Sequence, residues 1–143
     1  MKDHIQVEVL FNASKEKLWS AITDIHEMKK WYFENIPDFE PKVGFKTKFE
    51  IGSNEQIFTA TWEVLEVLKN ERIKYSWSYD EYDGIGITDF LLSEIGHKTL
   101  LTLTNEGIET FPQDIPAFTK ESCLAGWEYF LKERLKHYMI IQK

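Results

Sequence analysis

The side chains that could do chemistry are few and scattered along the 143-residue chain. Four histidines lie in different predicted elements and lack metal-ligand spacing: His4, His26, His97 and His137. Cys123 falls on an apolar stripe, which is typical of an inert buried thiol. The stretch from Asp80 to Gly84 lacks the carboxylate pattern of a calcium loop. With no nucleophile elbow, phosphate loop or dinucleotide fingerprint either, we predict no catalytic residue, no metal site and no cofactor.

Aromatic surface is what the sequence offers instead. Aromatic residues make up 15% of the chain, including 5 Trp and 10 Phe. Ligand pockets are mostly apolar and aromatic, with few polar groups. We therefore predict a ligand-binding set on one face of the strands and on the last helix, although simple core packing is the competing interpretation for each member. The set is Phe49, Phe58, Trp62, Tyr75, Trp77, Phe90, Leu103, Trp127 and Phe130.

Three uncharged polar side chains could orient such a ligand, namely Tyr75, Thr88 and Asn105. Hydroxyl and amide groups donate and accept hydrogen bonds without carrying charge. The competing interpretation is that a neighbouring group or water satisfies them. Gly126 lies in the predicted last helix, where glycine costs ~1 kcal/mol relative to alanine. We expect some neighbour to pack closely against it.

The apolar spacing predicts a strand, two short helices and then several strands. Residues 5–11 alternate as a half-buried strand. Ser14 is the expected N-cap of the first helix, and Asp24 with Glu27 reads as a capping box for the second. Further strands are expected at 45–51, 56–67, 72–79, 86–95 and 98–106, with an Asp83-Gly84 turn. Their short connections favour an antiparallel sheet.

The last third of the chain changes period. Apolar residues from Cys123 to Met139 form one helical stripe, which predicts a long amphipathic helix over about 120–141. The fold class is therefore α+β. A strongly curved sheet can wrap such a helix, and large aromatic side chains on both surfaces would leave a cavity between them.

Bulk properties narrow the classes of partner. The length favours a single domain, residues 1–143, and the net charge of −7 argues against nucleic acid. No segment approaches the ~18 apolar residues of a membrane span, so no membrane insertion is expected. The N-terminus lacks a signal-like apolar run, which makes a cytoplasmic location the expectation. Exposed aromatics such as Tyr32, Tyr82 or Phe111 could support a homodimer.

Several stretches together resemble the START-like, or helix-grip, superfamily, also called SRPBCC. They cover most of the chain in order: VEVLFNASKEKLWSAITD followed by MKKW, PKVGFKTKFE, EVLEVLKNERIKYSW, KTLLTLTNEG and AGWEYFLKERLKHY. Within the superfamily the chain resembles the branch named for the activator of the ATPase of the ninety-kilodalton heat-shock chaperone. The resemblance implies a helix-grip fold, with a hydrophobic tunnel between sheet and C-terminal helix that two short helices close at one end.

The resemblance also assigns expectations to single residues. Trp31 matches a family tryptophan and should face the tunnel opening, while Trp77 and Gly126-Trp127 match family aromatic and helix positions. Asn105 stands where many relatives carry a histidine, which weakens any acid–base role there. Because this superfamily hosts many functions, the fold does not fix the activity.

The favoured hypothesis is a protein that holds a small apolar or amphipathic molecule in this cavity, with the ligand left open. A cyclase- or hydrolase-type enzyme using the same cavity is the first alternative, and it is less favoured because it needs an inward acid–base pair. Asp89 or Glu50 would be its candidates. A chaperone-associated regulatory protein is the second alternative, also less favoured, since the namesake's additional chaperone-binding domain has no counterpart in this short chain.

Overall fold

One six-stranded antiparallel sheet carries the fold, with strand order β1-β6-β5-β4-β3-β2. The structure is a computed structural model that describes residues 4–52 and 57–141. From β2 to β6 each strand pairs with the next one in sequence, and β1 is added beside β6. The strands are β1 His4–Phe11, β2 Lys46–Gly52, β3 Ile57–Leu68, β4 Arg72–Tyr79, β5 Tyr82–Ile95 and β6 Lys98–Glu106.

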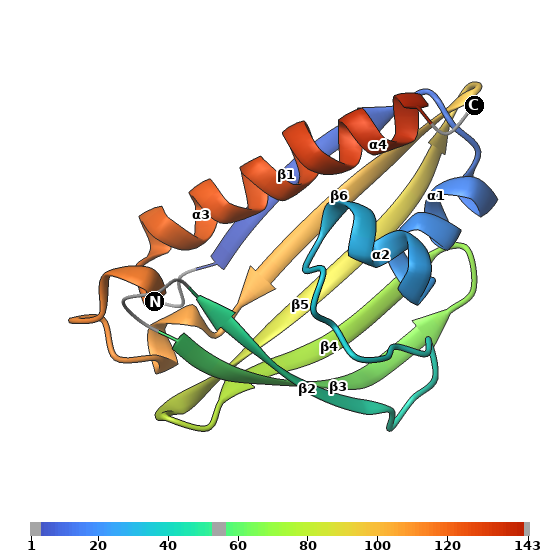
Figure 1. The fold of residues 1–143 in the computed structure, drawn as a ribbon. Helices are drawn as coiled ribbons and strands as arrows, with labels where there is room; N and C mark the ends of the chain where they lie inside the picture. The colour runs from blue at the N-terminus through green and yellow to red at the C-terminus, as the bar shows by residue number, and fades with distance from the viewer. Residues whose placement is uncertain (1–3, 53–56, 142–143) are drawn as a thin grey trace.

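Helices close both ends of the sheet and cross its inner face. Helices α1 (Lys15–Thr23) and α2 (Ile25–Trp31) follow β1, whereas the short 3-10 turns η1 (Ile108–Thr110) and η2 (Pro116–Phe118) follow β6. A long C-terminal helix then runs across the sheet, with α1 and α2 at one end and η1 and η2 at the other (Figure 1). It comprises α3 Lys120–Glu128, the π-helical turn η3 Tyr129–Leu135 and α4 Lys136–Ile141. The predicted α+β helix-grip architecture is confirmed.

Glu27 ties three helices together. The Asp24 carboxylate accepts from the Glu27 backbone N–H at 3.2 Å, as the capping box predicts. The Glu27 carboxylate does not complete the box, because the Asp24 N–H donates to the Ser20 carbonyl instead, at 2.8 Å. The Glu27 carboxylate accepts hydrogen bonds from the Ser20 hydroxyl on α1 and, at 2.9 Å, from the Tyr138 hydroxyl on α4. The predicted capping box is thus half correct, and its glutamate instead links α2 to α1 and α4.

The turn between β4 and β5 falls at Asp80-Glu81, so the expected Asp83-Gly84 turn is wrong. Gly84 lies inside β5 with a φ of +121°. A Cβ there would come within 2.7 Å of the Phe111 ring and of the Thr110 carbonyl. Glycine is therefore needed here because the segment after β6 packs closely against β5. Sequence spacing alone cannot distinguish such a glycine from one in a turn.

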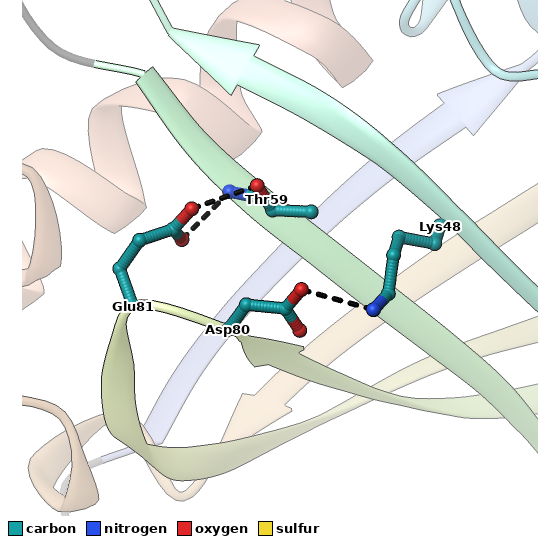
Figure 2. Close-up of polar contacts among 4 residues, drawn as sticks. All are labelled: Lys48, Thr59, Asp80 and Glu81. Atoms are coloured by element: carbon teal, nitrogen blue, oxygen red, sulfur yellow. Dashed lines mark hydrogen bonds and ion pairs between the residues drawn. The ribbon is translucent and has the colours of Figure 1, made fainter.

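Asp80 and Glu81 bind the tip of the β4–β5 hairpin to the neighbouring strands β2 and β3, as Figure 2 shows. The Glu81 carboxylate accepts from the Thr59 backbone N–H at 2.8 Å and from its hydroxyl at 2.7 Å. Asp80 pairs with Lys48 of β2 at 2.9 Å. The bonds from Thr59 lower the pKa of Glu81, because they stabilise the carboxylate form.

Two apolar clusters fill the space beneath the helices. The main core joins β1, the two short helices, the inner face of the sheet and the C-terminal helix. A smaller end cluster consists of Phe58, Phe111 and Phe118, with Tyr79, Tyr82 and Ile115 packed against it. Tyr32 and Phe111 are 4% and 7% exposed, so the expectation that they offer a dimer surface is wrong. Tyr82 is half-buried against Phe58 and Phe118.

We predict that Glu81→Gln flattens the acid limb of the stability profile. Because the folded pKa of Glu81 is lowered, its carboxylate contributes stability above the ordinary glutamate pKa of about 4.3 and loses it as the pH falls through the folded pKa. The difference in melting temperature between wild type and variant should be largest near pH 7 and shrink on acidification.

Glu40→Gln is the matched control, because the exposed Glu40 carboxylate makes no hydrogen bond or ion pair with another described residue. A difference between wild type and Glu81→Gln that stays constant from pH 7 down to pH 3 would contradict the prediction.

Candidate functional site

A pocket of about 290 Å³ lies where the main core and the end cluster meet. Its walls come from the segment after α2, the end of β2, the start of β3, the ends of β4 and β6, the segment after β6 and the first half of the long helix. Eight of its fifteen lining residues are aromatic. The lining residues are Phe33, Ile51, Gly52, Phe58, Trp77, Tyr79, Asn105, Ile108, Phe111, Ala117, Phe118, Cys123, Gly126, Trp127 and Phe130.

Five members of the predicted binding set line this pocket: Phe58, Trp77, Asn105, Trp127 and Phe130. Six others are buried in the main core and do not line it: Trp31, Phe49, Trp62, Tyr75, Phe90 and Leu103. All the strand members do lie on the inner face of the sheet, as alternation predicts. Alternation identifies the face but gives no position along the strand, so it does not separate wall from core.

Trp31 lies away from the pocket, which differs from its expected place at a tunnel opening. Its side chain is fully buried, its indole N–H donates to the Ala21 carbonyl at 2.7 Å, and its ring stacks on Tyr32 at 4.6 Å. Tyr32 in turn packs on Trp62 at 5.3 Å. Tyr32 therefore fills the inner face beside α2, whereas the next residue, Phe33, lines the pocket together with residues of η1 and η2.

Sequence reasoning missed most of the wall that comes from the segment between β6 and α3. Ile108, Phe111, Ala117 and Phe118 lie in this segment, which has no regular period to detect. Tyr79 could have been found, since it alternates with Trp77 along β4.

Only one of the three polar candidates lines the pocket. The Tyr75 hydroxyl is engaged with the Tyr32 hydroxyl at 2.8 Å. The Asn105 amide donates to the Ile87 carbonyl at 3.2 Å and to the Thr88 hydroxyl at 3.4 Å. Asn105 itself is 6% exposed and faces the pocket. Its amide nitrogen is thus used by the fold, while its carbonyl oxygen accepts from no described residue.

Two indole N–H groups, those of Trp62 and Trp77, are buried without a well-formed hydrogen bond to a described residue, although that of Trp77 lies close enough to the Tyr79 hydroxyl to influence its pKa. An unpaired buried donor costs about 1–3 kcal/mol. Both nitrogens are enclosed by protein atoms, so neither presents a donor to the pocket in this conformation.

The described walls carry no charge. None of the lining residues is an acid, a histidine, a lysine or an arginine. Burial raises the pKa of the Tyr79 hydroxyl and that of the Cys123 thiol, so both stay neutral near pH 7. Asp89 instead pairs with Arg72 at 2.6 Å on the outer face of the sheet, and Glu50 is exposed. The inward carboxylates that an enzyme would need are therefore not supplied by these two residues.

Gly126 corrects a further expectation. A Cβ at this position would meet nothing within 4 Å, so no neighbour packs closely against it. Cys123, Trp127 and Phe130 share its helix face and line the pocket with it. The space beside Gly126 is the pocket itself.

Within residues 4–52 and 57–141, no group of three or more His, Cys, Asp and Glu side chains is placed to hold a metal ion. Nor is any helix in these ranges long and apolar enough to cross a membrane.

Comparison with known families agrees with this architecture. The model of the family described as Activator of Hsp90 ATPase homolog 1-like protein matches residues 12–139. The chain belongs to this family. No curated protein matches this AHSA1-like chain significantly.

Solved structures share the AHSA1-like fold over nearly the whole chain. Protein CV1439 from Chromobacterium violaceum has a TM-score of 0.80 at 24% identity, covering 95% of this chain and 96% of that one. The Aha1 dimer from Colwellia psychrerythraea has a TM-score of 0.74 at 21% identity, covering 99% and 98%. DynU16, a protein of the dynemicin biosynthetic locus, has a TM-score of 0.79 at 22% identity, covering 99% and 48%. At these identities the likeness shows the fold alone.

We predict that Gly126→Ala raises the free energy of unfolding by up to ~1 kcal/mol, because alanine favours the helix and its methyl group enters empty space. Urea denaturation followed by circular dichroism measures the change. Ala125→Gly, at the neighbouring exposed position, is the matched control and should destabilise by a similar amount. Destabilisation by Gly126→Ala would mean that the space is occupied.

The thiol of Cys123 should react slowly. A raised pKa leaves less thiolate at a given pH, so iodoacetamide should alkylate the folded protein at pH 8 more slowly than the urea-unfolded chain. Mass spectrometry reports the reaction without ambiguity, since Cys123 is the single cysteine. Equal rates in the two states would contradict the burial of this side chain.

Proposed function

We propose that this AHSA1-like protein binds a small apolar or amphipathic molecule in the pocket between the sheet and the C-terminal helix. The observation that carries the proposal is the wall itself, in which eight aromatic side chains surround about 290 Å³ and no described lining residue is charged. Aromatic, mostly apolar walls with a few polar groups are the usual composition of ligand pockets.

The apolar area that a ligand buries determines how much binding free energy such walls can contribute. An aromatic group that buries about 200 Å² gains about 5 kcal/mol at roughly 25 cal/mol per Å². Association costs and side-chain ordering remove part of this gain. A purely apolar ligand should therefore bind only in the high-micromolar to millimolar range. Tighter binding needs polar contacts as well.

Two other functions lack comparable support from the pocket. A cyclase- or hydrolase-type enzyme would need an acid–base pair, and the described walls supply none. A chaperone-associated role is suggested only by the family description. Co-purification of a chaperone under gentle lysis, with the pocket shown to be empty by native mass spectrometry, would favour that role instead.

A homodimer is also a proposal, prompted by the dimeric Aha1 structure from Colwellia psychrerythraea. Sedimentation equilibrium across a range of concentrations would decide it, because a dimer has twice the mass of the 17.0 kDa chain.

The binding proposal is tested with N-phenyl-1-naphthylamine, an uncharged probe whose fluorescence rises in apolar surroundings. Gly126→Leu should weaken its binding at least about tenfold, because the new side chain enters the pocket. Trp77→Ala should also weaken binding by removing part of the wall.

Ala125→Leu is the matched control for Gly126→Leu, since it adds the same side chain one residue away, at an exposed position outside the wall. It should leave probe binding unchanged. Wild-type affinity in a correctly folded Gly126→Leu protein would show that the probe binds elsewhere and would remove the basis of the proposal.

A further inference from the structure

We infer that the pocket selects a flat, uncharged arene of about two fused rings that carries a hydroxyl group, and that the Asn105 carbonyl oxygen accepts the hydrogen bond from this hydroxyl. The inference rests on the proposed function, because it names the class of ligand for the same pocket.

The Asn105 side chain is held in one orientation, with its carbonyl oxygen as a hydrogen-bond acceptor. Its side-chain nitrogen donates to the Ile87 carbonyl at 3.2 Å and to the Thr88 hydroxyl at 3.4 Å, which fixes the amide plane. The residue is 94% buried and lines the pocket. With both amide donations directed at β5, the carbonyl oxygen is the group left without a donor among the described residues. This oxygen is not one of the side-chain atoms that are fully enclosed without a partner, so it is open to the pocket, where a ligand hydroxyl can donate to it.

The same oxygen discriminates against anions. A carboxylate or phenolate placed beside it would meet an acceptor rather than a donor. No described lining residue carries a positive charge to compensate, and the partly buried Tyr79 and Cys123, whose pKa values are raised, are neutral. Desolvating an anion against such walls is expensive. The chemistry therefore favours a neutral hydroxyl over an acid of the same shape.

Size and shape set the rest of the ligand. An apolar cavity of about 150 Å³ holds benzene. The pocket, at about 290 Å³, suits two fused rings. Flat rings suit walls in which Phe118 stacks on Tyr79 at 4.9 Å and Trp127 meets Trp77 edge-on at 6.0 Å.

The test is a matched series of naphthalenes measured by isothermal titration calorimetry at pH 7. Naphthalene supplies the rings alone, 2-methoxynaphthalene adds an oxygen without a donor, 2-naphthol adds a donor, and 2-naphthoate adds a charge. We expect 2-naphthol to bind about five- to tenfold more tightly than 2-methoxynaphthalene. It should bind at least about tenfold more tightly than 2-naphthoate.

Asn105→Leu should remove the preference for 2-naphthol over 2-methoxynaphthalene while both still bind. Tyr79→Phe is the parallel variant, because it removes a different polar group, the Tyr79 hydroxyl, from the wall, and the preference should survive it. Since Asn105→Leu leaves the Ile87 carbonyl and the Thr88 hydroxyl without their donor, a second measurement needs no variant. The side-chain carbonyl ¹³C resonance of Asn105 should shift with 2-naphthol and not with 2-methoxynaphthalene.

The outcomes separate the inference from the proposal beneath it. Equal binding of the three neutral naphthalenes, or a preference that survives Asn105→Leu, overturns the role of Asn105 and leaves the binding proposal intact. The binding proposal itself is overturned if no naphthalene binds and if Gly126→Leu binds N-phenyl-1-naphthylamine with the same affinity as wild type.

Discussion

Tyr32 makes the contacts on which the arrangement of sheet and helices depends. Its ring stacks on Trp31 at 4.6 Å and on Trp62 at 5.3 Å, and it meets Phe130 edge-on at 5.0 Å. Its hydroxyl shares a hydrogen bond with that of Tyr75 at 2.8 Å. One side chain thus joins α2, the inner face of β3 and β4, and the C-terminal helix. Because it is so deeply buried, its pKa is raised and the phenol stays neutral.

The pocket exists because this aromatic packing reaches only part of the way along the sheet. Tyr32 fills the inner face beside α2 together with Trp31 and Trp62, whereas its neighbours Phe33 and Phe130 reach the pocket. At the other end, Phe111 and Phe118 from the segment after β6 pack with Phe58 of β3 in the end cluster. The main core and the end cluster are separate, and aromatic side chains line the volume between them.

Periodicity in the sequence predicted the elements well, because alternation and helical spacing are local properties. The strand boundaries of β4 and β6 and the extent of the long helix were correct. The place of the pocket along the sheet was not, since it depends on how far the residues after α2 extend and where the segment after β6 returns. Gly84 and Gly126 show the same limit: the sequence predicts a turn at Gly84 and close packing at Gly126, yet Gly84 accommodates a neighbouring segment and Gly126 faces empty space. Only three-dimensional packing distinguishes these two cases.

The π-helical turn η3 determines the rotational phase between the two halves of the C-terminal helix. Before it, Cys123 and Trp127 point to the pocket, and after it Tyr138 points to the Glu27 anchor. Within it, Arg134 donates to the Lys30 carbonyl at the end of α2, which holds the turn in place. A residue removed from this turn would rotate one half relative to the other by about 100°, the angle per residue of an α-helix. The orientation of the pocket-lining residues is therefore coupled to that of Tyr138 towards Glu27. A change in the length of η3 would prevent both sets of side chains from facing their partners at once.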